Sequence, residues 1–177
     1  MAEPLFPAVD AHVIDTNLFI EFERASAVSL LERAVTDHSV VLLCPSRVYD
    51  ELTPETAPYE VPPIDTAIET GWVRVLEEID YTTPTVSATM DMVRHYIAVA
   101  DDRPEHGVEQ ADAEVGGATA QLLAQGDAAS VAVYTNDRAA FRGIDRALTA
   151  QGYAQQIELV TAQTVFEAVQ SRYEFQK

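Results

Sequence analysis

Cysteine and lysine are almost absent from this sequence. Its 177 residues include one cysteine, Cys44, and one lysine, Lys177, which is the last residue. A single cysteine excludes a disulfide within the chain. Ten arginines and the lysine stand against 29 aspartates and glutamates, which gives a formal net charge of −18. The chain therefore lacks the overall positive charge that phosphate binding normally draws on.

Long hydrophobic runs are also absent. No apolar stretch approaches the length needed to cross a bilayer. The first residues, MAEPLFPAVDAH, contain neither the basic segment nor the apolar segment of a secretory signal. We therefore expect a soluble, cytoplasmic protein.

The loss of lysine extends over the whole chain. Repulsion among so many carboxylates destabilises a compact state at low ionic strength, whereas molar salt limits its range to about 3 Å. We therefore expect a source with a salt-loaded cytoplasm, similar to that of halophilic archaea. The alternative is an acidic surface that binds a partner.

Hydrophobic residues make up 47% of the chain, enough for a substantial core. Short apolar runs predict strands at 11–15, 39–44, 71–77, 130–135 and 157–160. Helical spacing predicts helices at 16–37, 45–52, 85–102, 108–126, 136–152 and 161–175, and a proline-rich loop at 53–63. Alternating strands and helices indicate an α/β fold with a mostly parallel sheet, formed as a single domain over residues 1–177.

Two aspartates follow predicted strands directly. Asp15 ends the first strand in VIDTN, and Asp137 follows the strand at 130–135. Functional sites of open parallel sheets lie outside the carboxyl ends of the strands, so these side chains meet if their strands are neighbours. The alternative is that each aspartate only caps a helix or completes a turn.

Two more acids fit the same edge of the sheet. Glu51 lies on the helix at 45–52, and Asp112 interrupts a helix face that is otherwise small and apolar. Gly116 and Ala120, one and two turns after Asp112, allow that helix to pack closely. Four adjacent carboxylates would repel one another, and Mg²⁺ or Mn²⁺ would relieve that repulsion. For each acid taken alone, a cap or a solvated surface carboxylate is the alternative.

The four acids stand in motifs that resemble those of the PIN domain, a compact α/β nuclease family. Asp15 lies in VIDTN, Glu51 in PSRVYDEL, Asp112 in DAEVGGATA and Asp137 in YTNDRAAF. The motifs follow the family's order and spacing over nearly the whole chain, whereas residues 53–104 carry none. The resemblance, which extends to VapC-type proteins, implies a PIN-like three-layer α/β/α domain.

The resemblance implies a metal-dependent endoribonuclease that hydrolyses RNA with Mg²⁺ (or Mn²⁺). Asp15, Asp112 and Asp137 are the expected metal ligands. Glu51 is expected to orient the attacking water. The residues expected to hold carboxylates in place by hydrogen bonds are Thr16, Asn17 and Thr135.

Two further acids flank Asp112. Glu109 is three residues away and shares its helix face, so Glu109 also fits the site. Glu114, two residues beyond Asp112, is expected to point elsewhere. The sequence leaves open which acids of this helix face the metal.

Arginines recur near the acidic motifs. Arg138, Arg142 and Arg146 follow the last motif at intervals of four residues, and Arg47 lies one turn before Glu51. We expect Arg47, Arg138 and Arg142 to contact RNA phosphates. The alternative is an ordinary solvated face paired with acidic neighbours.

Partners follow from the resemblance. PIN-domain proteins often form symmetric dimers, and we expect a homodimer here. Four apolar residues in the corresponding region exceed what a small core needs: Phe19, Phe22, Leu30 and Leu31. Stand-alone PIN domains of this size are commonly toxins of type II toxin-antitoxin pairs, so a small antitoxin protein is a further expected partner. The alternatives are a housekeeping RNA-processing nuclease and a non-catalytic, protein-binding PIN-like module.

Two other phosphate-handling classes fit poorly. A haloacid-dehalogenase-type phosphotransferase needs a second aspartate where Asn17 stands, and it also needs a lysine. A phospho-receiver domain needs a lysine too, and the only one here is Lys177.

Overall fold

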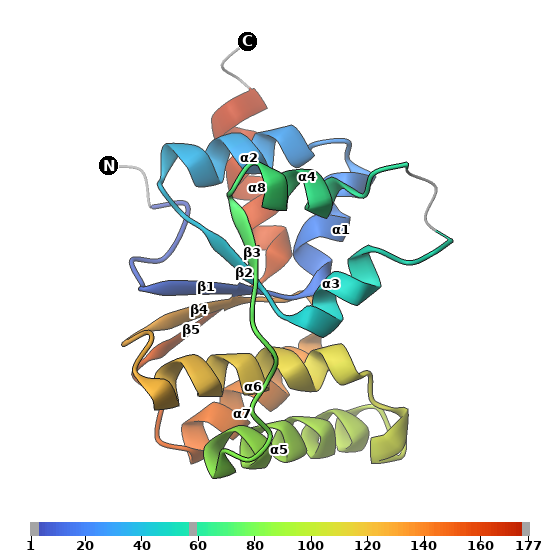
Figure 1. Cartoon of the computed structure of the whole chain (residues 1–177), viewed down its shortest axis with the longest axis vertical. Coiled ribbons are helices and arrows are strands. Elements are labelled where there is room, and N and C mark those ends of the chain that lie inside the picture. Colours follow the sequence, from blue (N-terminus) through green and yellow to red (C-terminus); the bar gives the residue numbers. More distant parts are fainter. Residues whose placement is uncertain (1–3, 57–59, 175–177) are drawn as a thin grey trace.

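The computed structural model describes residues 4–56 and 60–174, and a five-stranded sheet lies between its helical layers (Figure 1). The strands are β1 (Ala11–Ile14), β2 (Leu42–Cys44), β3 (Val73–Val75), β4 (Val131–Tyr134) and β5 (Ile157–Val160). They lie in the order β3-β2-β1-β4-β5, and each neighbouring pair is parallel. The predicted α/β fold with a central parallel sheet is confirmed.

Helices cover both faces of the sheet (Figure 1). On one side lie α1 (Thr16–Arg24), α2 (Val28–Asp37), α4 (Pro63–Glu69) and α8 (Ala162–Tyr173). On the other side lie α5 (Pro84–Ala100), α6 (Gln110–Gln125) and α7 (Arg138–Ala150), with the 3₁₀ turn η1 (Glu105–Gly107) before α6. The short helix α3 (Ser46–Leu52) contacts both α1 and α6, so it links the two layers at the carboxyl end of β2.

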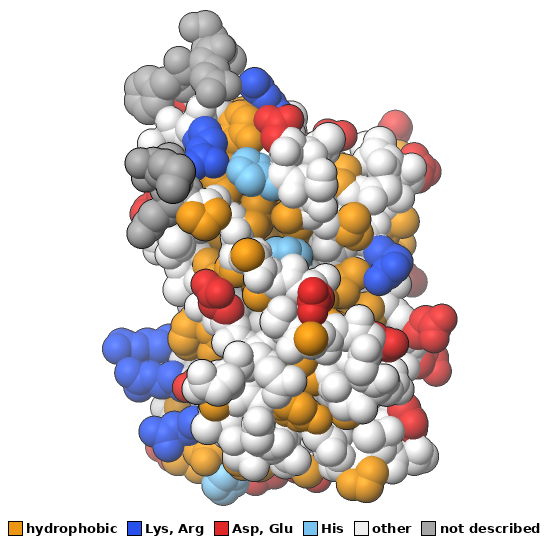
Figure 2. Space-filling model, turned by 90° about the vertical axis from the view of Figure 1, so that its left-hand side faces the viewer, with side chains coloured by type: hydrophobic (Ala, Val, Ile, Leu, Met, Phe, Trp, Pro, Cys, Tyr) orange, Lys and Arg blue, Asp and Glu red, His pale blue; other side chains and the backbone are white. Residues whose placement is uncertain are grey.

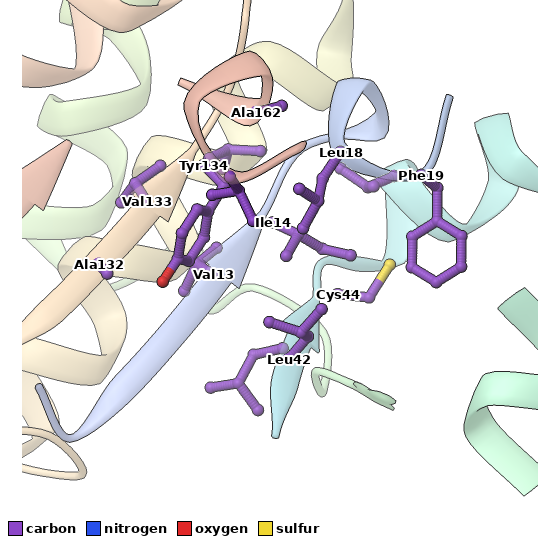
Figure 3. Packing of buried hydrophobic residues seen from close by; sticks show 14 of the residues in the cluster. Val13, Ile14, Leu18, Phe19, Leu42, Cys44, Ala132, Val133, Tyr134 and Ala162 are labelled. Atoms are coloured by element: carbon purple, nitrogen blue, oxygen red, sulfur yellow. The ribbon is translucent and has the colours of Figure 1, made fainter. Parts of the chain in front are cut away.

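The two central strands, β1 and β4, form the middle of the core. Every residue of both strands is buried, as expected for parallel strands covered on both faces. Val13 and Ile14 belong to the same buried cluster as Leu18 and Phe19 of α1. Figure 3 shows this packing together with the neighbouring residues Leu42, Cys44, Ala132, Val133, Tyr134 and Ala162.

The segment predicted as one helix at 16–37 forms two helices, so that prediction was wrong. Ser26 has a φ of 53°, a left-handed backbone conformation that interrupts the helix between α1 and α2. The backbone N–H of Ala27 donates to the carbonyl of Phe22 at 2.8 Å and closes the turn. Hydrophobic spacing continues across this turn, which explains why the sequence favoured one long helix.

The apolar residues expected at a dimer interface belong to the core. Phe19, Phe22 and Leu31 have no exposed surface, and Leu30 packs partly buried against the same cluster. Phe19 also stacks on Trp72, with the ring centroids 5.6 Å apart. These side chains therefore complete the core of one chain. A homodimer stays a prediction, and it requires another surface.

The second strand and the helix after it are shorter than predicted. Ser39 has a φ of 55°, and β2 begins at Leu42 instead of residue 39. Pro45 precedes α3 as its N-terminal cap residue and is not the first helical residue. These differences move element ends by a few residues and leave Glu51 on its predicted helix.

The sequence did not predict α4. Pro63 is its first residue, where the fixed φ of proline suits a helix start. Within the loop predicted at 53–63, residues 57–59 lie outside the described residues. The last residue of the helix predicted at 161–175 also lies outside them.

Glycines allow α5 and α6 to approach closely. A Cβ added at Gly116 would lie 2.9 Å from Cγ2 of Val93, and one at Gly117 would lie 2.7 Å from Cγ of Met90. Real side chains do not tolerate such distances without a shift of the neighbouring atoms. Because α6 is packed between α5 and the sheet, its residues from 111 to 120 are all buried, including the acidic ones.

Charged side chains are unevenly spread over the molecular surface. On the face in Figure 2, basic side chains gather at the left edge of the lower half, whereas acidic ones lie mainly toward the right. Locally basic areas therefore occur on the surface despite the net charge of −18. Over residues 4–56 and 60–174, we found no helix with the length and apolar content of a membrane span.

Candidate metal and catalytic site

The sheet topology brings the first and last acidic motifs together. β1 and β4 are neighbours in the middle of the sheet, while β2 and β5 lie on their outer sides. The backbone N–H of Asp15 donates to the carbonyl of Tyr134 at 3.0 Å, so the pairing continues to the ends of both strands. Crossovers that leave in opposite directions open a crevice at such a point, which is where open α/β sheets bind ligands.

A pocket of about 260 Å³ lies at this crevice. It contains all four motif acids, because its lining residues are Asp15, Thr16, Asn17, Ile20, Glu51, Arg103, Glu109, Asp112 and Asp137. Five carboxylates and one guanidinium thus line the pocket. The sequence predicted the four motif acids and left Glu109 open, whereas it did not identify Arg103.

A larger cavity, of about 820 Å³, lies elsewhere on the chain. Its lining includes His12 and Arg74, and no motif acid. Size alone therefore does not identify the functional site. The converging carboxylates of the smaller pocket give the stronger chemical signal.

Hydrogen bonds hold Asp15 in a fixed orientation. Oδ1 accepts from the backbone N–H of Thr16 at 2.7 Å, and Oδ2 accepts from Nδ2 of Asn17 at 2.9 Å and from Oγ1 of Thr135 at 2.7 Å. Asp15 is buried, and Thr135 has no exposed surface. Three donors compensate the buried charge. The residue therefore caps α1 and also presents a positioned carboxylate to the pocket.

Thr16 connects the start of α1 to the second acid. Its hydroxyl donates to Oε2 of Glu51 and leaves Oε1 of that carboxylate without a described donor. Burial raises the pKa of Glu51, the hydrogen bond from Thr16 opposes this rise, and the carboxylates of Glu109 and Asp15 add to it. Glu51 is thus a carboxylate with one oxygen held and one available.

Asp112 is the least compensated acid of the pocket. The residue is only 9% exposed, and none of the described residues donates a hydrogen bond to its side chain. Burial raises its pKa to about 8, helped by the neighbouring charges of Asp15, Asp137, Glu109 and Glu51. Without a cation, this carboxyl therefore holds a proton at neutral pH.

Asp137 has a local structural role. Its Oδ1 accepts from the backbone N–H of Ala140 at 2.8 Å and caps α7. Its own N–H donates to Oγ1 of Thr135 at 3.1 Å, which places it beside Asp15. Capping occupies one carboxylate oxygen and leaves Oδ2 without a described donor. Capping and ligand binding are therefore compatible at this residue.

The chemistry of the pocket fits a hard divalent cation. Its charged acceptors are all carboxylates, the ligands that Mg²⁺ and Mn²⁺ prefer. In the conformation of residues 4–56 and 60–174, no three Asp, Glu, His or Cys side chains are close enough to hold one ion. The oxygens of Asp112 and the free Oδ2 of Asp137 carry no structural hydrogen bond. These oxygens are therefore the ones available to an ion, while Oδ1 of Asp137 keeps its cap on α7.

Glu114 points away from the pocket, as the sequence suggested. It is 2% exposed, and its Oε1 accepts from Oγ of Ser46 at 2.8 Å and from the backbone N–H of Arg47 at 3.1 Å. These donors belong to the first turn of α3, the helix that carries Glu51. This cap could not be predicted from the sequence, because the carboxylate comes from α6, 68 residues away from Ser46.

The predicted RNA-contacting arginines differ in their surroundings. Arg47 lies 3.9 Å from Asp50 and 4.0 Å from Glu114, so it is paired with acidic neighbours. Arg138 and Arg142 are exposed on α7, and neither forms an ion pair with a described residue. None of the three lines the acidic pocket.

Comparison with known proteins found a family match. The sequence model described as "Halobacterial PIN domain" matches residues 8–174. This span includes the five strands and all residues that line the acidic pocket. Neither a curated protein nor a solved structure matched the chain.

Proposed function

Because the chain belongs to the halobacterial PIN domain family, we propose that it is an endoribonuclease that uses Mg²⁺ or Mn²⁺ to hydrolyse RNA phosphodiester bonds. PIN domains are generally nucleases, and the match also confirms the predicted relation to halophilic archaea. The observation that carries the metal-dependent part of the proposal is Asp112, a buried carboxyl that lies beside four other carboxylates and accepts no hydrogen bond from the described residues.

The proposed metal ligands are Asp15, Asp112 and Asp137. Asp15 supplies a carboxylate whose direction is fixed by three hydrogen bonds, while Asp112 and Asp137 supply oxygens that no described donor occupies. When bound, the cation would activate water and stabilise the charge on the leaving 3′ oxygen. Thr16, Asn17 and Thr135 support this site because each donates to one of its carboxylates.

Glu51 is the proposed residue that orients the attacking water. Its Oε2 is held by Thr16, and Oε1 can accept a hydrogen bond from a water in the pocket. Its raised pKa brings the carboxylate closer to the range in which it accepts a proton at neutral pH. A water held in this way attacks phosphorus directly, so the reaction does not need the 2′ hydroxyl of RNA.

Cleavage of a circular single-stranded RNA in molar KCl tests the proposal. We expect cutting with Mn²⁺ or Mg²⁺, none with EDTA, and products with 5′ phosphate and 3′ hydroxyl ends. A substrate with 2′-deoxyribose on the 5′ side of the cut bond should still be cut, which excludes a contaminating nuclease that attacks through the 2′ oxygen. Absence of metal-dependent cutting would favour a non-catalytic, protein-binding PIN-like module.

A toxin role with a small antitoxin partner is the finer proposal on cellular function. It rests on the family resemblance, since stand-alone PIN domains of this size are commonly such toxins. Expression in a halophilic archaeal host should arrest growth, and co-expression of a small protein encoded directly upstream should restore it. Normal growth combined with metal-dependent cleavage in vitro would favour a housekeeping RNA-processing nuclease.

A further inference from the structure

The loop between α5 and α6 places one positively charged side chain, that of Arg103, at the acidic pocket. Among the described residues that line this pocket, Arg103 is the only Lys or Arg. It lies outside the family motifs, in a segment to which the sequence assigned no role. Its surroundings indicate what it is positioned to bind.

Contacts within the loop orient the guanidinium of Arg103. Nη1 donates to the carbonyl of Gly107 at 2.9 Å, and Nη2 lies 3.1 Å from Oδ2 of Asp101. Nε is buried and has no partner among the described residues. The backbone N–H of Arg103 donates to the carbonyl of Ala98 at 3.0 Å, which joins the loop to the end of α5. The side chain is therefore positioned without help from the pocket acids.

Arg103 does not neutralise the carboxylates beside it. Its only ion pair with a described residue is with Asp101, which does not line the pocket. The side chain keeps 34% of its surface exposed. A guanidinium has five N–H groups, of which two are used in these contacts, so donors remain for a ligand. The planar arrangement of these donors matches the oxygens of a phosphate.

The charge of the pocket favours such a contact for an anionic substrate. Five carboxylates exceed the charge that one or even two divalent cations supply, so an approaching phosphodiester meets residual repulsion. The cationic side chain of Arg103 in the pocket wall offsets part of this repulsion.

We propose that Arg103 binds a non-bridging oxygen of the phosphodiester in the acidic pocket and is thus a substrate-binding residue of this nuclease. This assignment rests on the proposed function, because it requires that RNA enters the pocket. A purely structural role, in which Arg103 only fixes the loop, is the competing explanation.

Single-stranded RNA binding with Ca²⁺ in place of Mn²⁺ tests the assignment, and binding is measured over a range of KCl in which all variants are folded. Arg103→Gln should bind RNA about tenfold more weakly, as expected for one charge-assisted hydrogen bond. Its slope of log Kd against log[KCl] should fall by about 0.7, the contribution of one phosphate contact in a single strand. Arg103→Lys should restore the slope and only part of the affinity, since an ammonium keeps the charge and loses the planar donors.

Arg74→Gln is the matched control. Arg74 is an exposed arginine that lines the larger cavity, so its removal changes net charge equally and should leave affinity and slope unchanged. The rise in melting temperature on adding Mn²⁺, measured for every variant, reports on the metal site without RNA. Arg103→Gln should keep this rise.

The outcomes separate the assignment from the proposed function. If Arg103→Gln keeps the wild-type affinity and slope, the assignment is overturned. It is also overturned if Arg103→Gln loses affinity with an unchanged slope and Arg103→Lys does not recover that affinity. A wild-type protein that responds to Mn²⁺ but binds no RNA overturns it while the metal site stands. A wild-type protein with neither response overturns the proposed function and the assignment together.

Discussion

The hydroxyl of Thr135 donates a 2.7 Å hydrogen bond to Oδ2 of Asp15. It joins the end of β4 to the end of β1, two strands that are neighbours in space and 120 residues apart in the chain. Asp15 thereby accepts three hydrogen bonds, whereas Asp112 in the same pocket accepts none from the described part of the chain. Replacement by asparagine should therefore lower the stability of the metal-free protein at Asp15 and raise it at Asp112.

Asp15→Asn should destabilise the metal-free protein by about 1–3 kcal/mol, because an amide NH₂ in place of one carboxylate oxygen would face a hydrogen-bond donor. Chemical unfolding in molar KCl measures this cost. An unchanged free energy of unfolding would mean that the hydrogen bonds from Thr135 and Asn17 do not hold this carboxylate in solution.

The buried cap from Glu114 should support both stability and the position of Glu51. Glu114→Ala leaves the donors of Ser46 and Arg47 without an acceptor, so it should cost about 1–3 kcal/mol of stability. Cleavage should also slow, because α3 carries Glu51. Glu114→Gln is the control, since its amide oxygen can accept both hydrogen bonds. Equal stability of the alanine and glutamine variants would contradict this role.

The sequence predicted the acidic residues because their motifs are local. VIDTN and YTNDRAAF each place an aspartate between a strand and a helix, and a parallel sheet then brings two such ends together. The break between α1 and α2 was missed, because Ser26 changes backbone conformation while the hydrophobic spacing continues across it. Contacts between distant segments were also invisible. Glu114 caps a helix far away in the sequence, and Arg103 reaches the pocket from a loop without a motif.

The exposed arginines of α7 should behave differently from Arg47. Replacing Arg138 and Arg142 with Gln should weaken RNA binding irrespective of sequence and flatten its salt dependence, because both are free to contact phosphates. Arg47→Gln should change the salt dependence less, since Arg47 already lies beside Asp50 and Glu114. Binding titrations at several KCl concentrations compare the three proteins. Equal slopes in all of them would leave α7 as an ordinary solvated face.

The raised pKa of Asp112 predicts a pH-dependent stability. Its pKa is about 8 in the folded protein, well above the 3.8 of an ordinary aspartate, so near neutral pH the folded state holds a proton that the unfolded state releases. Stability from this group is fully present below about pH 4 and is lost as the pH rises toward 8. Asp112→Asn removes this dependence. The difference in melting temperature between the variant and the wild type, without metal, should therefore grow from pH 5 to pH 8.

Exposed Asp127 provides the control for that comparison. It lines the larger cavity and precedes the first residue of β4, whereas the pocket lies at the other end of that strand. Asp127→Asn changes the net charge by the same amount as Asp112→Asn. Its melting temperature should follow that of the wild type at every pH. A growing difference for Asp127→Asn as well would attribute the effect to total charge and not to the pocket.

The melting temperature of Asp112→Asn at pH 8, with and without Mn²⁺, tests the metal site most directly. Without metal, the variant should be more stable than the wild type. Its neutral amide adds no negative charge to the pocket and needs no bound proton to stay uncharged. With Mn²⁺, it should gain much less, since stabilisation by a ligand follows RT ln(1 + [L]/Kd) and the variant has lost a ligand. Asp127→Asn should show the full wild-type rise. If Asp112→Asn shows that full rise too, the acidic pocket is not the metal site.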